Sequence, residues 1–470
     1  MTTSDHAAIA AQPHLFSYAG GPAMRRYMVL YGLAALAGAA LWGGVGGVLI
    51  PLHVQQIEFA HYFAGAMSSV NLQELLALKA RVAAGAAQAD AAQQALLDAL
   101  AAYESAKAAN LAMIKSIAVA VTMLMQPLVG IASDRTRSRW GRRAPWIVAG
   151  AIAAIAGLAC MRFSASIAQL LMGWVVAQAG ITMVMGPLAA TVVDRMPATL
   201  RGLMSAVAGM GLVMGFIVGM AIAGALYGRL GMGSYLLFAA ALALFSIAFV
   251  GMARDHSSLT LQNQPASIGT HLLSCTHALR DHDFRFVWSA RILLMFGYAA
   301  AATYTVYMLQ SYIQPGLTAA EAAKTVALLN LAALPGTLIA MFAVGRWSDR
   351  IMRRKPFVVG ASFLLAASMA VPFFWPTLAA LYVQFVVGGL AFGTFLSVDQ
   401  ALLIDVLPNK SAAGRDLGMG AFAANLGSLL GPAMAGGLLS ATGGYRMIWL
   451  AALLLAAIAG FVLMPVRRAR

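Results

Sequence analysis

Arg291 and Asp399 are the residues of this sequence whose types and positions most directly indicate chemistry. Each is a charged residue inside a long apolar stretch, where a central charge costs about 2.5–3.5 kcal/mol on insertion scales and is therefore kept for a function. Arg291 lies about seven residues after its stretch begins, and Asp399 lies six positions before Asp405 (405 − 399), at the end of another stretch. At a helical rise of about 1.5 Å per residue, each lies about 9–10 Å inside its apolar stretch, and both depths are measured from the same side of the membrane that these stretches would cross.

Equal depth and opposite charge predict an ion pair between Arg291 and Asp399. Such a pair could take up and release a proton, because protonation of the carboxylate removes its attraction to the guanidinium. We therefore predict both residues as candidates for proton coupling. The alternatives are a purely structural pair, or an Arg291 side chain that extends along the helix to the surface.

Two basic segments, residues 130–145 and 345–356, share a pattern that defines a second candidate site. Each reads G-x-x-S-D-R, continues as a short basic run and reaches a proline that opens the next apolar stretch. The first glycines of the two copies lie 215 positions apart (345 − 130). Such a pattern rarely occurs twice by chance at the same place in two halves, so it indicates an internal repeat of membrane helices.

Acidic residues stand in matching places around these two segments, two in each half. Guanidinium groups bind carboxylates through two parallel hydrogen bonds, so we expect a latch that holds the helix ends together and breaks when that side opens. The alternative is charge that only sets topology. The predicted latch residues are Asp134, Arg135, Arg142, Arg143, Asp194, Asp349, Arg350, Arg354 and Asp405.

Aromatic and amide side chains within the apolar stretches form a third set. Trp and Tyr faces with amide donors suit a polyhydroxylated ring, and they equally suit hydrogen bonds between helices. The candidates for a substrate cavity are Trp174, Gln178, Tyr298, Tyr304, Gln310, Gln384, Gln400 and Asn425.

Patterns of enzyme chemistry are absent from the sequence, which has no P-loop, no H-E-x-x-H, no C-x-x-C and no G-x-S-x-G. Cys160 lies in an apolar stretch and Cys275 in a polar loop, neither beside other metal-ligand residues. We therefore expect neither an enzyme nor an ATP-driven pump, and neither a metal nor a cofactor.

The elements that position these residues are apolar stretches of membrane-spanning length. The chain has 470 residues, of which 61% are hydrophobic and only 10% charged, against about 25% charged in soluble domains. A membrane-spanning helix needs about 20 apolar residues. The sequence has twelve such stretches, at 27–52, 111–132, 145–164, 167–193, 202–228, 233–253, 284–312, 322–346, 356–375, 377–406, 416–440 and 445–465.

Most of the 31 Lys and Arg residues lie in short segments on the side of the N-terminus. The positive-inside rule places that side in the cytoplasm, so the net charge of +15 reflects topology and does not indicate nucleic-acid binding. The predicted domains are a cytoplasmic tail at 1–26, a six-helix bundle at 27–253, a cytoplasmic linker at 254–283, a second six-helix bundle at 284–465 and a cytoplasmic basic tail at 466–470.

An insert at 55–110 separates the first two apolar stretches and is predicted to lie outside the cytoplasm. Residues 72–110 are rich in Ala, Gln, Glu and Leu, which favour helix, and Gly85 is the expected break. An apolar stripe at helical spacing comprises Leu96, Leu97, Leu100 and Tyr103. We expect the second helix to continue into the next span. The insert would cap the outer mouth, or alternatively dock an extracytoplasmic partner or a second copy.

Twelve stretches in two halves with this doubled motif resemble the major facilitator superfamily. Residues 133–146 are similar to the long motif of glycoside and sucrose:cation symporters, and residues 42–55 and 398–408 resemble the first and tenth helices of sucrose transporters. The resemblance implies an all-α membrane protein of the bacterial-type inner membrane, with two six-helix bundles and both termini cytoplasmic.

The same resemblance implies alternating access, with proton-coupled symport of a sugar, a glycoside or a similar small polar solute. The expected partners are this solute, a coupling proton or another cation, and the lipid bilayer. The alternatives are an exporter of another organic solute, or a non-transporting assembly or receptor protein of the same fold that uses 55–110.

Overall fold

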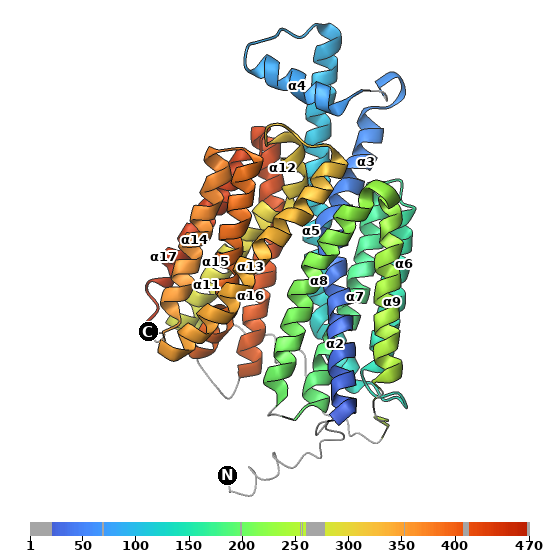
Figure 1. The fold of residues 1–470 in the computed structure, drawn as a ribbon, viewed down its shortest axis with the longest axis vertical. Helices are drawn as coiled ribbons and strands as arrows, with labels where there is room; N and C mark the ends of the chain where they lie inside the picture. Colours follow the sequence, from blue (N-terminus) through green and yellow to red (C-terminus); the bar gives the residue numbers. More distant parts are fainter. Residues whose placement is uncertain are drawn as a thin grey trace, which may run out of the picture.

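A computed structural model of the chain describes residues 21–67, 70–197, 200–253, 255, 257–259, 278–351, 353–407 and 413–467. These residues form helices and connecting turns, without a strand among them. The helices stand side by side in an elongated bundle (Figure 1). Most of the predicted N-terminal tail, most of the 254–283 linker and the end of the basic tail lie outside the described residues.

The N-terminal half begins with one continuous helical rod that changes its geometry midway. It then continues through the short helix α4 of the insert into five further long helices. Its elements are α2 (Gly21–Leu41), a π-helical segment (Trp42–Leu49), α3 (Ile50–Tyr62), α4 (Leu72–Ala83), α5 (Ala91–Arg135), α6 (Ala144–Arg162), α7 (Ile167–Arg195), α8 (Arg201–Leu230) and α9 (Ser234–Met252).

The C-terminal half repeats this plan without an insert. Its elements are α11 (His282–Thr303), α12 (Thr305–Ser311), α13 (Ala319–Ile351), α14 (Lys355–Phe374), α15 (Leu378–Asp405), α16 (Ala413–Thr442) and α17 (Arg446–Leu463). The stretch predicted as one span at 284–312 is interrupted at Tyr304, which separates α11 from α12.

Eleven helical stretches of the described residues are long and apolar enough to cross a membrane. One of these, Leu203–Met252, contains both α8 and α9, joined by a single short turn at Gly231–Gly233. Each of the twelve stretches predicted from the sequence therefore corresponds to a helix or to a helix pair such as α11 and α12. The all-α, two-bundle prediction is confirmed.

The helices pack mainly within their own half. In the N-terminal half α2 packs on α8 and α9, and α7 packs on α5 and α6; in the C-terminal half α11 packs on α16 and α17, and α15 packs on α13 and α14. Small residues permit these approaches: a side chain at Gly219 of α8 would collide with the backbone of Ala40, and one at Gly431 of α16 would collide with Ala299. The two halves meet along α5–α16 and α8–α13.

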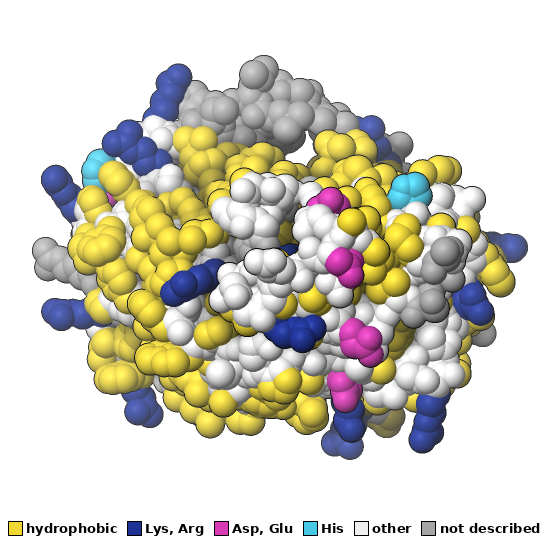
Figure 2. Space-filling model, turned by 90° about the horizontal axis from the view of Figure 1, so that it is seen from above, with side chains coloured by type: hydrophobic (Ala, Val, Ile, Leu, Met, Phe, Trp, Pro, Cys, Tyr) yellow, Lys and Arg dark blue, Asp and Glu magenta, His cyan; other side chains and the backbone are white. Residues whose placement is uncertain are grey.

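The insert projects from the end of the bundle opposite the start of α2 and the end of α17 (Figure 1). Gly85 follows α4 with φ +70°, the break expected there, and Asp90 then caps α5, which runs for 45 residues through the insert and the second span. Phe63, Leu75, Leu100 and Tyr103 form a separate apolar core beneath α4. We call this end of the molecule the insert end; Figure 2 shows its face.

Candidate functional site

Arg291 of α11 and Asp399 of α15 form the ion pair expected from the sequence. Nε of Arg291 lies 3.2 Å from Oδ2 of Asp399, and Asp399 is only 3% exposed. Gln400 accepts from both terminal nitrogens of Arg291, at 3.3 and 3.4 Å. The glycine at position 420 of α16 leaves room for this guanidinium, since a Cβ there would lie 3.1 Å from its NH1. The pair thus joins α11 to α15 and lies beside α16, and its role in coupling stays a prediction.

The N-terminal bundle holds a second polar cluster around Gln178 of α7. Its amide oxygen accepts from Nε1 of Trp42 at 2.9 Å, and its amide nitrogen donates to Oγ1 of Thr122 at 3.2 Å. Trp174, one turn away on α7, is 3% exposed, and its Nε1 has no hydrogen-bond partner among the described residues. Gln178 and Trp174 therefore lie together, with Trp42 and Thr122 beside them, and their role in a substrate cavity stays a prediction.

Lys115 of α5 is a functional candidate that the sequence reasoning missed. Its ammonium donates to the backbone carbonyl of Gly46, and it pairs with no carboxylate in the described part of the chain. Lys115 lies within the span predicted at 111–132. A cation four residues inside an apolar stretch was the available signal.

Other predicted cavity residues lie in the contact between the two bundles near the insert end. Tyr304 is fully buried and donates to the carbonyl of Ala108 at 2.9 Å. Gln310 and Gln55 exchange two amide hydrogen bonds, at 2.8 and 2.9 Å. Tyr307 donates to the carbonyl of Pro51 at 2.8 Å. In this conformation Tyr304 and Gln310 join the bundles together and do not line an open cavity.

The remaining candidates lie within the C-terminal bundle. Tyr298 stacks on Phe392, with ring centroids 4.2 Å apart. Gln384 is buried, its amide nitrogen lies 3.8 Å from Sδ of Met369, and its oxygen has no hydrogen-bond partner among the described residues. Asn425 is half-buried on α16. The structure therefore does not bring all the predicted cavity residues to one place.

Replacing Gly224 with Leu is expected to separate the bundles at the insert end. A side chain at Gly224 of α8 would collide with the backbone of Ala323 at the start of α13, so the contact closes only with glycine there. In purified protein with Cys160 and Cys275 changed to Ser, we expect maleimide labelling of Ala108→Cys, a position that is fully buried, to increase at least about fivefold. The matched control is Gly228→Leu one turn later, where a Cβ meets nothing within 4 Å. Equal labelling in both variants would contradict this account.

The predicted latch residues form ion pairs within each half. Asp194 of α7 binds both Arg142 and Arg143, with Nε of Arg143 at 3.0 Å. Arg143 also reaches Oδ1 of Asp134 at 2.6 Å and Oγ of Ser133 at 2.6 Å. These contacts tie α5, α6 and α7 together at the end opposite the insert, which we call the basic-loop end.

The C-terminal half has a simpler version of the same arrangement. Arg354 pairs with Asp405 and donates to the carbonyl of Ala401 at 3.1 Å, which ties α14 to α15. Arg135 and Arg350 are exposed at the ends of α5 and α13, and the side chain of Asp349 lies outside the described residues. Because the pairs seen lie within one bundle, separation of the bundles does not require them to break; the predicted breaking stays a prediction.

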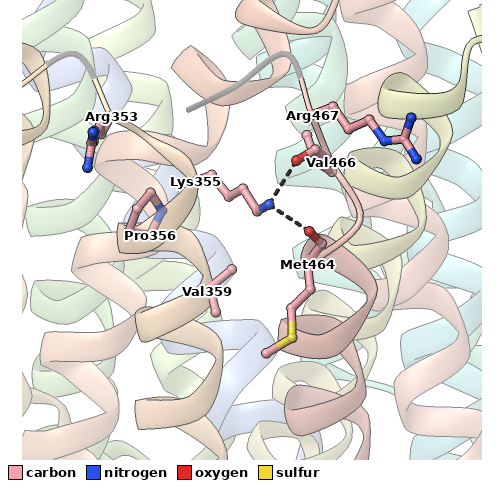
Figure 3. A pocket seen from close by; sticks show the side chains of 7 residues that line it. All are labelled: Arg353, Lys355, Pro356, Val359, Met464, Val466 and Arg467. Carbon is pink, nitrogen blue, oxygen red and sulfur yellow. Dashed lines mark hydrogen bonds between the residues drawn. The ribbon is translucent and has the colours of Figure 1, made fainter.

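A pocket of about 510 Å³ lies at the basic-loop end between α14 and the end of α17 (Figure 3). Nζ of Lys355 donates across it to the carbonyls of Met464 and Val466, at 2.6 and 2.8 Å. These bonds satisfy carbonyls that the end of α17 leaves without helical partners. None of the predicted site residues lines this pocket, so it is not part of the candidate site.

The fold and the buried pair define a two-bundle helical membrane protein with ionisable groups inside its spans. The model of the Major Facilitator Superfamily matches residues 91–340 and 323–470. The chain belongs to this superfamily. It is therefore a multi-pass membrane transporter of a small-molecule solute and not an enzyme.

Solved structures with the same fold are similar over almost the whole chain. A bacterial homolog to the human lysosomal transporter Spinster, inward-facing and unoccupied, aligns over 97% of both chains with TM-score 0.64 and 13% identity. The nucleoside transporter NupG aligns over 94% of this chain and 98% of its own, with TM-score 0.66 and 12% identity. At such identities the likeness shows the fold alone. No curated protein sequence matches this chain significantly.

Proposed function

We propose that this protein is a secondary active transporter that works by alternating access and couples a small polar solute to protons. The Arg291–Asp399 pair carries this proposal, because ionisable groups inside membrane helices typically mark substrate or proton pathways. An aspartate can exchange one proton per cycle, and its guanidinium partner can stabilise the ionised state. Gln400 holds the guanidinium in reach of Asp399.

We further propose that the basic-loop end faces the cytoplasm and that the structure represents an inward-facing conformation. The clustering of arginine there supports the orientation. The hydrogen bonds of Tyr304, Tyr307 and Gln310 across the bundle interface support closure of the insert end. In this proposal, the two tails, the linker and the two bundles have the residue boundaries predicted from the sequence.

The insert acts in this proposal as a cap on the outer mouth. Nε2 of Gln73 on α4 donates to the carbonyl of Leu317, which precedes α13, at 3.0 Å. This bond joins the insert to the opposite bundle and favours a cap over a docking surface for another protein. The alternative of an extracytoplasmic partner or a second copy stays open for the exposed part of α4.

Sugars or glycosides are the substrate class that the motif resemblance of residues 133–146 supports. Trp174 and Gln178 offer an aromatic face beside an amide, which suits a hydroxylated ring. Export of another organic solute is the second candidate. Membership of the Major Facilitator Superfamily supports transport over the non-transporting role considered from the sequence.

Proton-driven uptake into proteoliposomes tests the proposal. Vesicles that are acidic outside should accumulate the solute above its external concentration, and a proton ionophore should abolish the accumulation. The solute would first be found by a thermal-shift screen of the purified protein against sugars and metabolites. Accumulation that is insensitive to the ionophore would exclude proton coupling.

Labelling of single cysteines in intact cells tests the orientation. Gln88 in the insert and Arg139 in the basic loop are both exposed. In a background with Cys160 and Cys275 changed to Ser, an impermeant maleimide should label Gln88→Cys and leave Arg139→Cys unlabelled until the membrane is permeabilised. The reverse pattern would overturn the orientation and the placement of the insert together.

A further inference from the structure

The ammonium of Lys115 and the indole of Trp174 both lie close to Gly46 in the N-terminal bundle. A Cβ built at Gly46 would lie 3.7 Å from the indole ring of Trp174 and 3.9 Å from Nζ of Lys115. Nε1 of Trp174 has no hydrogen-bond partner among the described residues, although the side chain is 3% exposed. Lys115 donates to one backbone carbonyl and has no carboxylate partner in the described part of the chain.

The chain geometry explains why Lys115 rests on the carbonyl of Gly46. In the π-helical segment the N–H of Ile50 bonds to the carbonyl of Val45, five residues before it. The next donor in that register would be the N–H of residue 51, but Pro51 has none. The carbonyl of Gly46 is therefore left without a helical donor, and the ammonium of Lys115 takes that place.

A single carbonyl compensates only part of the positive charge of Lys115. A half-buried ammonium with no anionic partner loses hydration that one neutral dipole does not replace. The indole N–H of Trp174 is a buried donor without an acceptor among the described residues, which is rare in folded proteins. An acceptor with negative charge at this place would satisfy both groups.

We infer that Lys115 and Trp174 bind a carboxylate group of the transported solute. The inference rests on the proposed transport function and names its substrate class. A carboxylate has one negative charge and two acceptor oxygens, which match one ammonium and one indole N–H. A phosphate is a poorer match, because a phosphate monoester carries about −1.5 to −2 charge and three acceptor oxygens at pH 7, whereas this cluster offers one cation and one further N–H.

The cluster around Gln178 provides the rest of such a site. Gln178 is fixed by Trp42 and Thr122 at 2.9 and 3.2 Å, one turn along α7 from Trp174. Hydroxyl groups of the same solute could exchange hydrogen bonds with these three polar side chains. A hydroxylated carboxylic acid would bind Lys115 and Trp174 through its carboxylate and the Gln178 cluster through its hydroxyl groups.

Thermal-shift titrations of the purified full-length protein test this inference. The probes are matched neutral, carboxylate and phosphate compounds: glucose, glucuronate and glucose 6-phosphate, the corresponding galactose series, and short hydroxy acids beside their diols. A carboxylate should raise the Tm where its neutral and phosphate partners do not. Lys115→Met should weaken that carboxylate's affinity about tenfold or more, and Trp174→Phe should weaken it less, because the ring remains.

The matched control is Lys79→Met, since Lys79 pairs with Glu104 in the insert and should leave affinity unchanged. If Lys115→Met does not fold, Lys115→Gln keeps a donor for the Gly46 carbonyl while removing the charge. Carboxylate affinity unchanged in either Lys115 variant, preference for neutral or phosphate compounds, or a panel in which no carboxylate stabilises the protein would each overturn the inference. Equilibrium binding needs no proton gradient, so a failure of proton coupling would leave this result intact.

Discussion

Asp399→Asn is expected to abolish proton-driven accumulation of the solute while leaving exchange without a gradient largely intact. Asn keeps the shape of Asp and can still hydrogen-bond to Arg291, but it cannot bind and release a proton in the cycle. Solute loaded on one side should therefore still exchange across the membrane. The measurement is uptake into proteoliposomes with and without an imposed proton gradient.

The matched control for Asp399→Asn is Asp405→Asn, which changes an acid on the same helix that lies outside the buried pair. It should retain accumulation to a normal gradient, even where its rate is lower. Normal accumulation by Asp399→Asn would show that Asp399 is only structural, and the proton-coupling proposal would then fail at its central residue.

Stability measurements separate the structural from the coupling role of this pair. Arg291→Gln alone leaves a buried carboxylate without its cation, which costs about 3–5 kcal/mol in buried pairs. The double variant Arg291→Gln with Asp399→Asn removes both charges and should recover much of the loss. Thermal unfolding of the purified variants measures these stabilities. A double variant no more stable than Arg291→Gln would contradict the ion pair between Arg291 and Asp399.

The large features of this fold follow from local sequence signals. The twelve apolar stretches and the repeated G-x-x-S-D-R pattern predict helices and their symmetry, because length and composition alone decide what crosses a membrane. Position along the helices also predicts the pairing of Arg291 with Asp399. Both residues lie at a similar distance from the basic-loop end of their helices, so side-by-side packing of α11 and α15 brings the two charges together.

Local sequence signals do not predict contacts between segments that are distant in the chain. The π-helical geometry at 42–49 depends on how the glycines there pack against α8, and only that geometry frees the carbonyl that Lys115 occupies. Tyr304 and Gln310 were predicted to line a cavity, yet their roles depend on which end of the interface is closed. Conformational state is a property of the whole chain, and no single stretch encodes it.

The latch residues show the same limit on a smaller scale. Their charges and their repeat were evident from the sequence, and Asp194 with Asp405 predicted two matching sites. The structure adds that Asp194 binds two arginines whereas Asp405 binds one, and that both sites lie within a single bundle. This asymmetry makes a direct comparison of the two acids informative.

Asp194→Asn is expected to destabilise the protein much more than Asp405→Asn. Asp194 is largely buried beside Arg143, whose side chain is 6% exposed, so the substitution leaves two guanidinium groups without a full counter-charge. Such a loss costs about 3 kcal/mol. Asp405 is 39% exposed and has one arginine partner, so water compensates for much of the change.

Thermal unfolding of the two purified variants measures this difference. We expect the decrease in Tm caused by Asp405→Asn to be less than half of that caused by Asp194→Asn. Equilibrium affinity for the solute should stay within about tenfold in both, because only the balance of conformations shifts. Equal decreases in Tm would show that burial at the basic-loop end does not set the strength of these pairs. Loss of solute binding in a folded Asp194→Asn protein would instead place this acid in the binding site, since a residue that only ties α5, α6 and α7 together cannot remove binding without unfolding them.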